Sequence, residues 1–392
     1  MNKIEQLQAA HGTPFYLYEG KKIAAQAEIL HHTFPDFTVL FSVKANPFPP
    51  VLKKMAALGI GADAASVKEI DLAAEAGIPA ESIYYSAPAP TKEDIAHAIG
   101  KCHIIADSLH VLSLLEETAG NTTLPVGIRI HPDFTMDGAP QVPSKFGIDE
   151  AIVWATDFAK TYPHLRIVGL HVHIRSQVLD TVQLNRYYEN ILSLAVRLQN
   201  HLGAPLEYIN CGGGVGTVYN PEKQSPPDFA VLRQNILSLW EKYPLSAKLL
   251  LESGRFLACS CGTYVTEIVD IKESHGKKFY VVKNGINGFF KPVLRTLIQT
   301  VCPQAVIGSF EPLLTEDDAY EIHVLSDSTE TETVDIVGHL CTGTDVLAKE
   351  ISVRKGQIGD LITFNHAGSY AYSLAPLLFA SQPLPKQIFI DE

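Results

Sequence analysis

One lysine stands where an amine could do covalent chemistry. The β-favouring run 38–41 leads to Lys44, and Pro47 follows three residues later, so Lys44 is predicted at the exit of a strand that the proline ends. We expect this side chain to be poorly solvated. Burial disfavours the charged form of a lysine and makes its amine available for Schiff-base chemistry. A surface lysine at a strand end is the alternative for this segment alone.

A glycine run and a glutamate point to a phosphate and to a heterocyclic ring. The run 212–214 follows the apolar segment 206–210, and glycines let backbone N–H groups approach a phosphate closely. An ordinary tight turn is the alternative. Glu252 ends another apolar run, where its carboxylate would keep a pyridine nitrogen protonated. An ion pair with Arg255 would explain the same glutamate.

Two histidines alternate with apolar residues in the run 170–174. His171 and His173 are separated by one residue, so both side chains share one face of a predicted strand. The sequence suggests no third ligand for a metal, and we expect none. We favour His173 as a flat ring stacked on an aromatic cofactor, whereas His171 also fits a core histidine. Ser176, just beyond, could donate a hydrogen bond to phosphate.

Three charged residues lie in or near the other predicted strands. Asp63 is in an early strand, and Glu69 follows it in a capping-box pattern with Ser66 that explains Glu69 without any catalytic role. Arg129 is a charge inside an apolar strand and therefore requires a partner. A cofactor oxygen or a neighbouring carboxylate would satisfy it.

The last third of the chain carries a thiol, a carboxylate and a phenol in turn-like segments. Cys341 and Asp345 are four residues apart, and Tyr370 lies in a Gly-Ser-Tyr turn. A polar turn is a poor place for a purely structural cysteine. The hydroxyl of Tyr370 could be a further phosphate ligand.

The elements that must position these residues alternate between strand and helix. Eight strands are predicted at 38–42, 61–65, 83–87, 103–107, 125–131, 167–174, 206–210 and 247–252. Eight alternating units match a (β/α)8 TIM-type barrel better than an open sheet. Chemistry collects at the carboxyl ends of barrel strands, and closure makes the first and eighth strands neighbours. Lys44 and Glu252 should therefore converge.

A second domain is predicted where the pattern changes to β-rich runs with turns. We expect the barrel over 20–253 and a β domain over 254–392, which the N-terminal strand region 1–19 would join. The β domain should contain the runs 262–269, 279–282, 332–340, 350–354 and 360–364.

Composition excludes several classes of function. A net charge of −12 over 392 residues argues against nucleic acid and anionic membranes, which both favour a basic face. No run approaches the ~20 apolar residues of a membrane span. The six cysteines show no Cys-x-x-Cys spacing, which suits reduced thiols and a cytoplasmic protein.

Six motifs occur in one order along the chain: Lys44, the His-x-His strand, the triple glycine, Glu-x-Gly-Arg, Cys-x-x-x-Asp and Gly-Ser-Tyr. Together they resemble the fold-type III pyridoxal-phosphate amino-acid decarboxylases, the group of diaminopimelate and eukaryotic-type ornithine decarboxylases. The resemblance covers nearly the whole chain. It implies a barrel with a β domain, pyridoxal 5'-phosphate as cofactor, and an obligate homodimer with shared active sites.

The resemblance also implies roles for individual residues. Lys44 would bind the cofactor covalently, and Cys341 would reach the active site of a partner subunit and return a proton after carbon dioxide leaves. The expected cofactor-binding residues are Lys44, Asp63, Glu69, Arg129, His173, Ser176, Gly212, Gly213, Gly214, Glu252, Arg255 and Tyr370.

Departures from the family pattern bear on the substrate, which Arg175, Thr342 and Asp345 are expected to contact. The family carries an acidic residue directly after the cysteine to bind a distal amine, and here that residue is Thr342. Arg175 stands where glycine is usual. Losing a carboxylate and gaining a cation suits a substrate whose far end is anionic. Arg175 could instead form an interface salt bridge.

The stretches 264–272 and 337–342 are similar to the branch of the family found in citrate-based siderophore pathways. Those enzymes decarboxylate an amino acid already joined to citrate, such as citryl-diaminopropionate or O-citryl-serine. Decarboxylation of diaminopimelate or another basic amino acid is the nearest alternative. A catalytically inactive paralogue that binds a partner is an alternative of another class, and retention of Lys44 and Cys341 speaks against it.

Overall fold

The protein is described by a computed structural model that covers residues 2–243, 245–304 and 320–391. Its internal contacts divide the chain into two compact units. The barrel unit comprises residues 24–218 and 225–257. The β unit comprises residues 1–23, 219–224 and 258–392. Each unit therefore draws on segments that are separate in the sequence.

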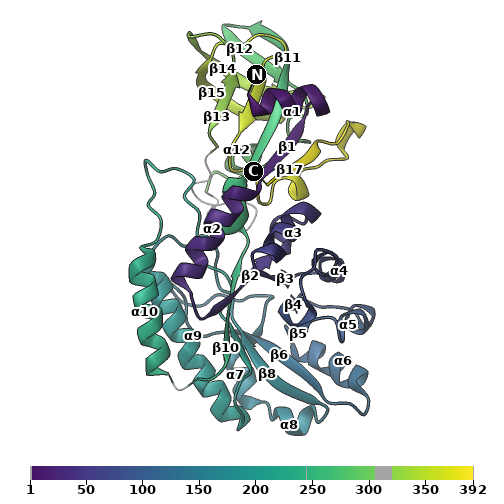
Figure 1. Ribbon diagram of the computed structural model, residues 1–392, viewed down its shortest axis with the longest axis vertical. Helices are drawn as coiled ribbons and strands as arrows, with labels where there is room; N and C mark the ends of the chain where they lie inside the picture. The colour runs from purple at the N-terminus through teal and green to yellow at the C-terminus, as the bar shows by residue number, and fades with distance from the viewer. Residues whose placement is uncertain (1, 244, 305–319, 392) are drawn as a thin grey trace. The chain divides into compact units, whose positions relative to one another are not determined.

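The barrel unit is built on a closed ring of parallel strands, which confirms the predicted barrel fold (Figure 1). The order is β5-β4-β3-β2-β10-β9-β8-β6, and β5 pairs with β6 to close it. The strands are β2 (Phe37–Ser42), β3 (Gly61–Ala64), β4 (Ile83–Ser86), β5 (His103–Ala106), β6 (Leu124–His131), β8 (Leu165–His171), β9 (Tyr208–Asn210) and β10 (Lys248–Ser253). A two-residue strand, β7 (Ile148–Asp149), is added beside β6.

Helices surround the strands of the barrel unit (Figure 1). They are α2 (Gly20–Thr33), which begins in the β unit, α3 (Pro49–Ala57), α4 (Val67–Glu75), α5 (Lys92–Ala98), α6 (Leu109–Ala119), α7 (Glu150–Ala155), α8 (Phe158–Thr161), α9 (Thr181–Leu202), α10 (Phe229–Lys242) and α11 (Arg255–Ala258). Local sequence fixes their starts. The Thr91 side chain caps α5 in a full capping box with Asp94, and Asp180 accepts two backbone N–H groups at the start of α9.

Tyr208 fills the interior of the barrel, and two glycines make room for its ring. A Cβ atom at Gly169 would lie 2.1 Å from the ring carbon Cζ of Tyr208, and one at Gly127 would lie 2.1 Å from the phenol oxygen. Any larger residue at either position would overlap Tyr208. Around this ring pack Leu40, Tyr84, Ile105, Val168 and Leu250.

The next interior layer of the barrel is polar. Side chains two residues apart on a strand point to the same face. Counting two positions on from Leu40, Gly61, Tyr84, Ile105, Gly127, Gly169, Tyr208 and Leu250 gives the eight residues Ser42, Asp63, Ser86, Asp107, Arg129, His171, Asn210 and Glu252. We call them the polar layer. They lie at or just past the carboxyl ends of the eight strands, where barrel enzymes place their chemistry.

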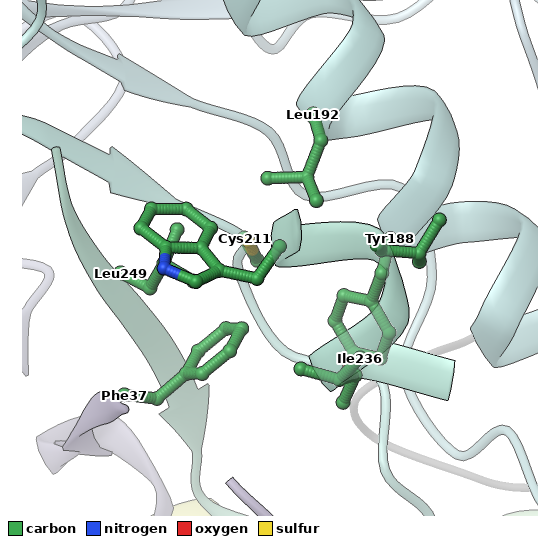
Figure 2. A pocket seen from close by; sticks show the side chains of 8 residues that line it. Phe37, Tyr188, Leu192, Cys211, Ile236 and Leu249 are labelled. Atoms are coloured by element: carbon green, nitrogen blue, oxygen red, sulfur yellow. The ribbon is translucent and has the colours of Figure 1, made fainter. Parts of the chain in front are cut away.

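A small apolar cavity lies between the barrel strands and the helices α9 and α10. Phe37, Tyr188, Leu192 and Cys211 line it together with residues of α10 (Figure 2). Its volume is about 10 Å³, and a cavity needs roughly 10–15 Å³ by this measure to hold one water molecule. The cavity is thus a packing gap and cannot take a substrate.

The β unit is an eight-stranded sheet with the path β13-β16-β11-β12-β14-β15. Its strands are β1 (Phe15–Glu19), β11 (Gly262–Ser274), β12 (Lys277–Val282), β13 (Ile322–Leu325), β14 (Thr331–Gly338), β15 (Val346–Arg354), β16 (Leu361–Phe364) and β17 (Lys386–Ile390). The early strand β1 pairs antiparallel with β11 and parallel with β17. Strands β13 and β17 were not predicted from the sequence.

Aromatic side chains form much of the core of the β unit. Tyr16 on β1 donates to the carbonyl of Gly288, and Tyr264 on β11 donates to that of Asn284. The two rings lie 4.9 Å apart. This unit also contains the helices α1 (Lys3–His11) and α12 (Lys291–Val301). Across the described parts of the chain, no helix is both long and apolar enough to cross a membrane.

Candidate active site

Lys44 lies on a short turn directly after β2. This turn, η1 (Val43–Ala45), carries the lysine past the strand end, and its side chain is 45% exposed. The expectation that Lys44 is buried was therefore wrong, because the extra turn lifts the side chain out of the barrel interior. Its Nζ atom lies 3.5 Å from Oδ2 of Asp63 in the polar layer. The lysine thus stands at the carboxyl end of the barrel, with a carboxylate beside its amine.

Two carboxyl groups near Lys44 have pKa values above their ordinary range. Burial, together with repulsion from Glu252, raises the pKa of Asp63. Burial raises the pKa of Glu69 to about 7. Glu69 accepts a hydrogen bond of 2.7 Å from the backbone N–H of Ala65, while Ser66 caps the N–H of Glu69 at 3.3 Å. The predicted cap is present on the Ser66 side, and the Glu69 carboxylate turns to the loop that follows β3.

His173 lies against the glycine run. The N–H of Gly213 donates to Nδ1 of His173 at 3.0 Å, so this nitrogen acts as an acceptor. Burial lowers the pKa of His173 to about 3, and the ring is neutral at physiological pH. A Cβ atom at Gly212, where φ is +60°, would lie 2.3 Å from the carbonyl oxygen of Val172 and 2.9 Å from Cβ of His173. The glycines therefore permit the close approach of an uncharged, flat imidazole.

Two of the three backbone N–H groups of the run 212–214 are engaged locally, and phosphate binding by this run stays a prediction. Gly212 donates to Oδ1 of Asn210 at 2.9 Å, and Gly213 donates to His173. The carbonyl of Gly212 in turn accepts the N–H of Glu252. The run thus ties the ends of β8, β9 and β10 together.

Glu252 is buried at the end of β10 with two polar neighbours. Its Oε1 atom accepts a hydrogen bond of 2.9 Å from the amide of Asn210 and lies 3.2 Å from Nε2 of His171. Burial opposes the ionisation of Glu252, but the charges of His171 and Lys44 outweigh it and hold the pKa of Glu252 well below its usual range. Glu252 is therefore a carboxylate at physiological pH.

Arg129 finds its partner in a neighbouring carboxylate. Its guanidinium donates to Oδ1 of Asp107 at 3.4 Å and to the carbonyl of His173 at 3.5 Å. The ring of Phe146 packs against the same guanidinium, 4.7 Å from the ring centroid. The neighbouring carboxylate that the sequence allowed as a partner is therefore Asp107, and a cofactor contact by Arg129 stays a prediction.

Arg175 follows β8 at the mouth of the barrel, and Ser176 is the next residue. The guanidinium of Arg175 lies 3.3 Å from Oδ2 of Asp137 and donates to Oε1 of Gln183 at 2.5 Å. Its side chain remains 42% exposed. The arginine is therefore held at the rim by one charged and one neutral neighbour of the same unit.

In the β unit, the turn after β14 carries the expected thiol. Cys341 is exposed, whereas Asp345 is buried. The Asp345 carboxylate accepts the N–H groups of Ile286 and Leu340, at 2.7 Å and 3.0 Å. It thereby fixes the turn that presents the cysteine. Substrate contacts by Asp345 and by the half-buried Thr342 stay predictions.

Two further residues of the β unit lie in the Gly-Ser-Tyr turn. Tyr370 is buried and has a positive φ of 51°. The hydroxyl of Ser369 is buried and makes no hydrogen bond with the described residues. A phosphate contact by Tyr370 stays a prediction.

Two residues that hold the site together were not predicted from the sequence. Asn210 bridges Glu252 and the glycine run, and Asp107 pairs with Arg129. Each is the last residue of a predicted strand and lies two positions after an apolar residue that points into the barrel. This spacing in the sequence could have identified both.

Comparison with known proteins identifies the family. Residues 20–259 match the pyridoxal-dependent decarboxylases over their pyridoxal binding domain. The chain belongs to this family. It is a fold-type III decarboxylase that uses pyridoxal 5'-phosphate.

Three relatives of this decarboxylase carry three different substrate names. The chain is 30% identical to L-glutamyl-[BtrI acyl-carrier protein] decarboxylase of Niallia circulans, over 98% of this chain and 90% of the relative. It is 29% identical to 2-[(L-alanin-3-ylcarbamoyl)methyl]-2-hydroxybutanedioate decarboxylase of Staphylococcus aureus, over 99% and 97%. The crystal structure of diaminopimelate decarboxylase from M. jannaschii in co-complex with L-lysine is 26% identical and has a TM-score of 0.86, over 99% and 89%. Similarity of this degree shows the reaction class and leaves the substrate open.

The residues at the carboxyl end of the barrel fit pyridoxal phosphate. Lys44 offers an amine for the aldehyde, and the buried carboxylate of Glu252 matches a protonated pyridine nitrogen. Glycine at 213 leaves space beside the imidazole, since a Cβ there would lie 3.3 Å from Cε1 of His173. The buried hydroxyl of Ser253 has no hydrogen-bond partner among the described residues and is thus available to a polar group of the cofactor.

Proposed function

We propose that this pyridoxal-phosphate decarboxylase removes the α-carboxylate of an amino acid joined to citrate, of the citryl-diaminopropionate or O-citryl-serine type, in the biosynthesis of a siderophore. The observation that carries the proposal is the guanidinium of Arg175 at the barrel rim. The name of the Staphylococcus aureus relative describes an alanine unit in amide linkage to a hydroxybutanedioate. Such a substrate has carboxylates at its far end, and an arginine pairs well with carboxylates.

The electrostatic setting of Arg175 is compatible with this reading. Asp137 and Gln183 hold the guanidinium, and Asp137 is exposed at the surface. An exposed ion pair contributes little, roughly 0–1 kcal/mol. A substrate with two carboxylates would therefore replace Asp137 without a large energetic penalty.

In this proposal, each of four residues of the barrel unit has a separate role in the reaction. Pyridoxal phosphate, when bound, supplies an electron sink for the electron pair that departing carbon dioxide leaves behind. Lys44 would hold the cofactor through its amine, and Glu252 would hold the proton of the pyridine nitrogen. His173 would offer the ring an uncharged imidazole. Asp63 lies beside Lys44 and accepts or returns a proton at its amine.

We further propose that the decarboxylase acts as a cytoplasmic homodimer in which Cys341 serves the site of the partner subunit and returns a proton to Cα. The exposed thiol on a turn that Asp345 fixes supports this role. The test mixes two variants, Lys44→Ala and Cys341→Ala, under conditions that exchange subunits. Mixed dimers would regain one intact site each, so activity above both parents is expected. No gain in freely exchanging dimers would contradict the shared site.

Diaminopimelate or another basic amino acid is the alternative substrate. The similarity to the M. jannaschii diaminopimelate decarboxylase favours it, and Asp137 offers an acidic group for a distal amine. The two proposals differ in the sign of the charge that the rim of the barrel must recognise.

The deciding experiment measures carbon dioxide release by the enzyme loaded with pyridoxal phosphate. Citryl-diaminopropionate and O-citryl-serine are compared with meso-diaminopimelate, lysine and ornithine. Turnover confined to a citryl compound is expected. Turnover of a free diamino acid alone would overturn the substrate proposal and leave the decarboxylase assignment intact.

A pair of arginine variants then tests the rim. Arg175→Gln should raise KM for the citryl substrate about tenfold or more with little change in kcat, because one charge-assisted contact is lost. Arg166→Gln is the matched control, since Arg166 is an exposed arginine at the start of the same strand and pairs with Glu207. An unchanged KM in Arg175→Gln would remove Arg175 from substrate recognition.

A further inference from the structure

His171 occupies a buried position in the polar layer beside the carboxylate of Glu252. The strand register places it between Arg129 on β6 and Asn210 on β9. The side chains of His171 and Glu252 are 3% and 5% exposed, and Nε2 lies 3.2 Å from Oε1. On the other side of the ring, Nδ1 lies 3.4 Å from the hydroxyl of Ser86. One imidazole thus links a carboxylate to a hydroxyl inside the barrel.

The contact between His171 and Glu252 is electrostatic in kind. Among the described residues Nε2 has no hydrogen-bond partner of acceptable geometry, although it lies 3.2 Å from Oε1 of Glu252. The hydrogen bond to Oε1 comes from the neutral amide of Asn210. Both close contacts involve Oε1, and Oε2 takes part in neither. A buried carboxylate needs a charged partner or it takes up a proton, and His171 is the cationic candidate nearest to Glu252.

We propose that His171 is a positioning residue that keeps Glu252 in its carboxylate form and, through Glu252, keeps the pyridine nitrogen of pyridoxal phosphate protonated. The inference rests on the proposed contact of Glu252 with that nitrogen. One proton is shared between the ring nitrogen and the glutamate. A cation on the far side of the carboxylate stabilises the charge-separated arrangement, with the proton on nitrogen. Without that cation, the proton moves to Glu252 and the nitrogen becomes neutral.

Several other titratable or charged groups surround His171. They are Asp63 on β3, Asp107 after β5, Arg129 on β6, His173 after β8 and Glu252 on β10. The carboxylate nearest to the ring by a measured distance is Glu252.

The experiment loads the enzyme with pyridoxal phosphate that carries nitrogen-15 in its ring and follows the nitrogen chemical shift by NMR as a function of pH. In the wild-type enzyme the nitrogen is expected to keep its proton through neutral pH and to lose it only at alkaline pH. In His171→Gln, the pH at which the nitrogen loses its proton should fall by about one unit or more, a tenfold change in the equilibrium. Ser86→Ala should shift it in the same direction by less.

Two controls separate the possible failures. His103→Gln makes the same substitution at the first residue of β5, where the histidine stacks on Tyr84 with ring centroids 4.6 Å apart, and it should leave the nitrogen shift unchanged. Glu252→Gln should deprotonate the nitrogen. If Glu252→Gln has no effect, the proposed role of Glu252 fails.

If Glu252→Gln acts but His171→Gln matches the wild type, the role of His171 is overturned. Should His171→Gln not fold, as judged by circular dichroism, Ser86→Ala decides. An unchanged nitrogen shift in Ser86→Ala would then count against the proposal.

Discussion

Replacing Gly212 by alanine should damage both the barrel and the cofactor site. Gly212 has φ +60°, a conformation that costs a residue with a Cβ roughly 1–2 kcal/mol. The new Cβ would also lie 2.3 Å from the carbonyl oxygen of Val172, and overpacking of this kind costs typically 1–3 kcal/mol. The free energy of unfolding should therefore fall by about 2–5 kcal/mol.

A second glycine separates the two contributions. Gly203 ends α9 with φ +65°, and a Cβ there meets no atom within 4 Å. Gly203→Ala should lose only the conformational part, about 1–2 kcal/mol. Urea unfolding of the cofactor-free protein, followed by tryptophan fluorescence, measures the barrel unit alone because both tryptophans, Trp154 and Trp240, lie in it.

The binding of pyridoxal phosphate provides an independent readout. Gly212→Ala pushes on Cβ of His173, which would lie 2.9 Å from the added methyl group, so the dissociation constant of the cofactor should rise. Gly203→Ala should leave it unchanged. The reasoning is refuted if the two alanine variants are equally stable and bind the cofactor equally well, because the overlap with Val172 would then have no consequence.

Two further predictions concern protons. The folded-state pKa of Glu69 is about 7, above its ordinary value of 4.5, so its contribution to stability is present below pH 4.5 and is lost as pH rises through 7. Glu69→Gln should therefore stabilise the cofactor-free barrel at pH 8 by up to about 3 kcal/mol and make its free energy of unfolding less dependent on pH. Urea unfolding at pH 5 and pH 8 measures this, and identical midpoints for both proteins at both pH values would contradict it. Cys341→Ala should slow turnover and increase the share of carbonyl product, because the proton for Cα is no longer delivered. Chromatography of the products measures that share. An unchanged ratio of amine to carbonyl product would exclude Cys341 as the proton donor.

The barrel was predictable because its strands are short apolar runs that polar residues end. The predicted ends of each of the eight strands lie within a few residues of the observed ends. The polar residues at those ends are those of the polar layer. In the β unit, β13 and β17 were missed. β13 ends the path of the sheet, and β17 pairs with β1 alone among the described strands, so neither has the two-sided burial that gives a central strand its apolar pattern.

Contacts across the barrel were not predictable from strand ends alone. His171 and Glu252 belong to strands that β9 separates, and whether they touch depends on the tilt and stagger of the ring. The prediction that Lys44 is buried was wrong for a local reason. The turn η1 after β2 has only three residues, which is too short to show a periodic pattern in the sequence. The sequence therefore predicts which residues gather at one end of the barrel, and the geometry decides which of them meet.

The pairing of β1 with β17 has a consequence for how the protein folds during translation. Residues 15–19 emerge from the ribosome early, but their partners at 386–390 are made last. Every strand of the barrel is synthesised between them. The barrel can thus fold during translation, while β1 gains β11 as its first neighbour and lacks its second until β17 is made. We expect nascent chains halted before residue 386 to hold a protease-resistant barrel and an N-terminal segment that proteases cut faster than in the full-length chain.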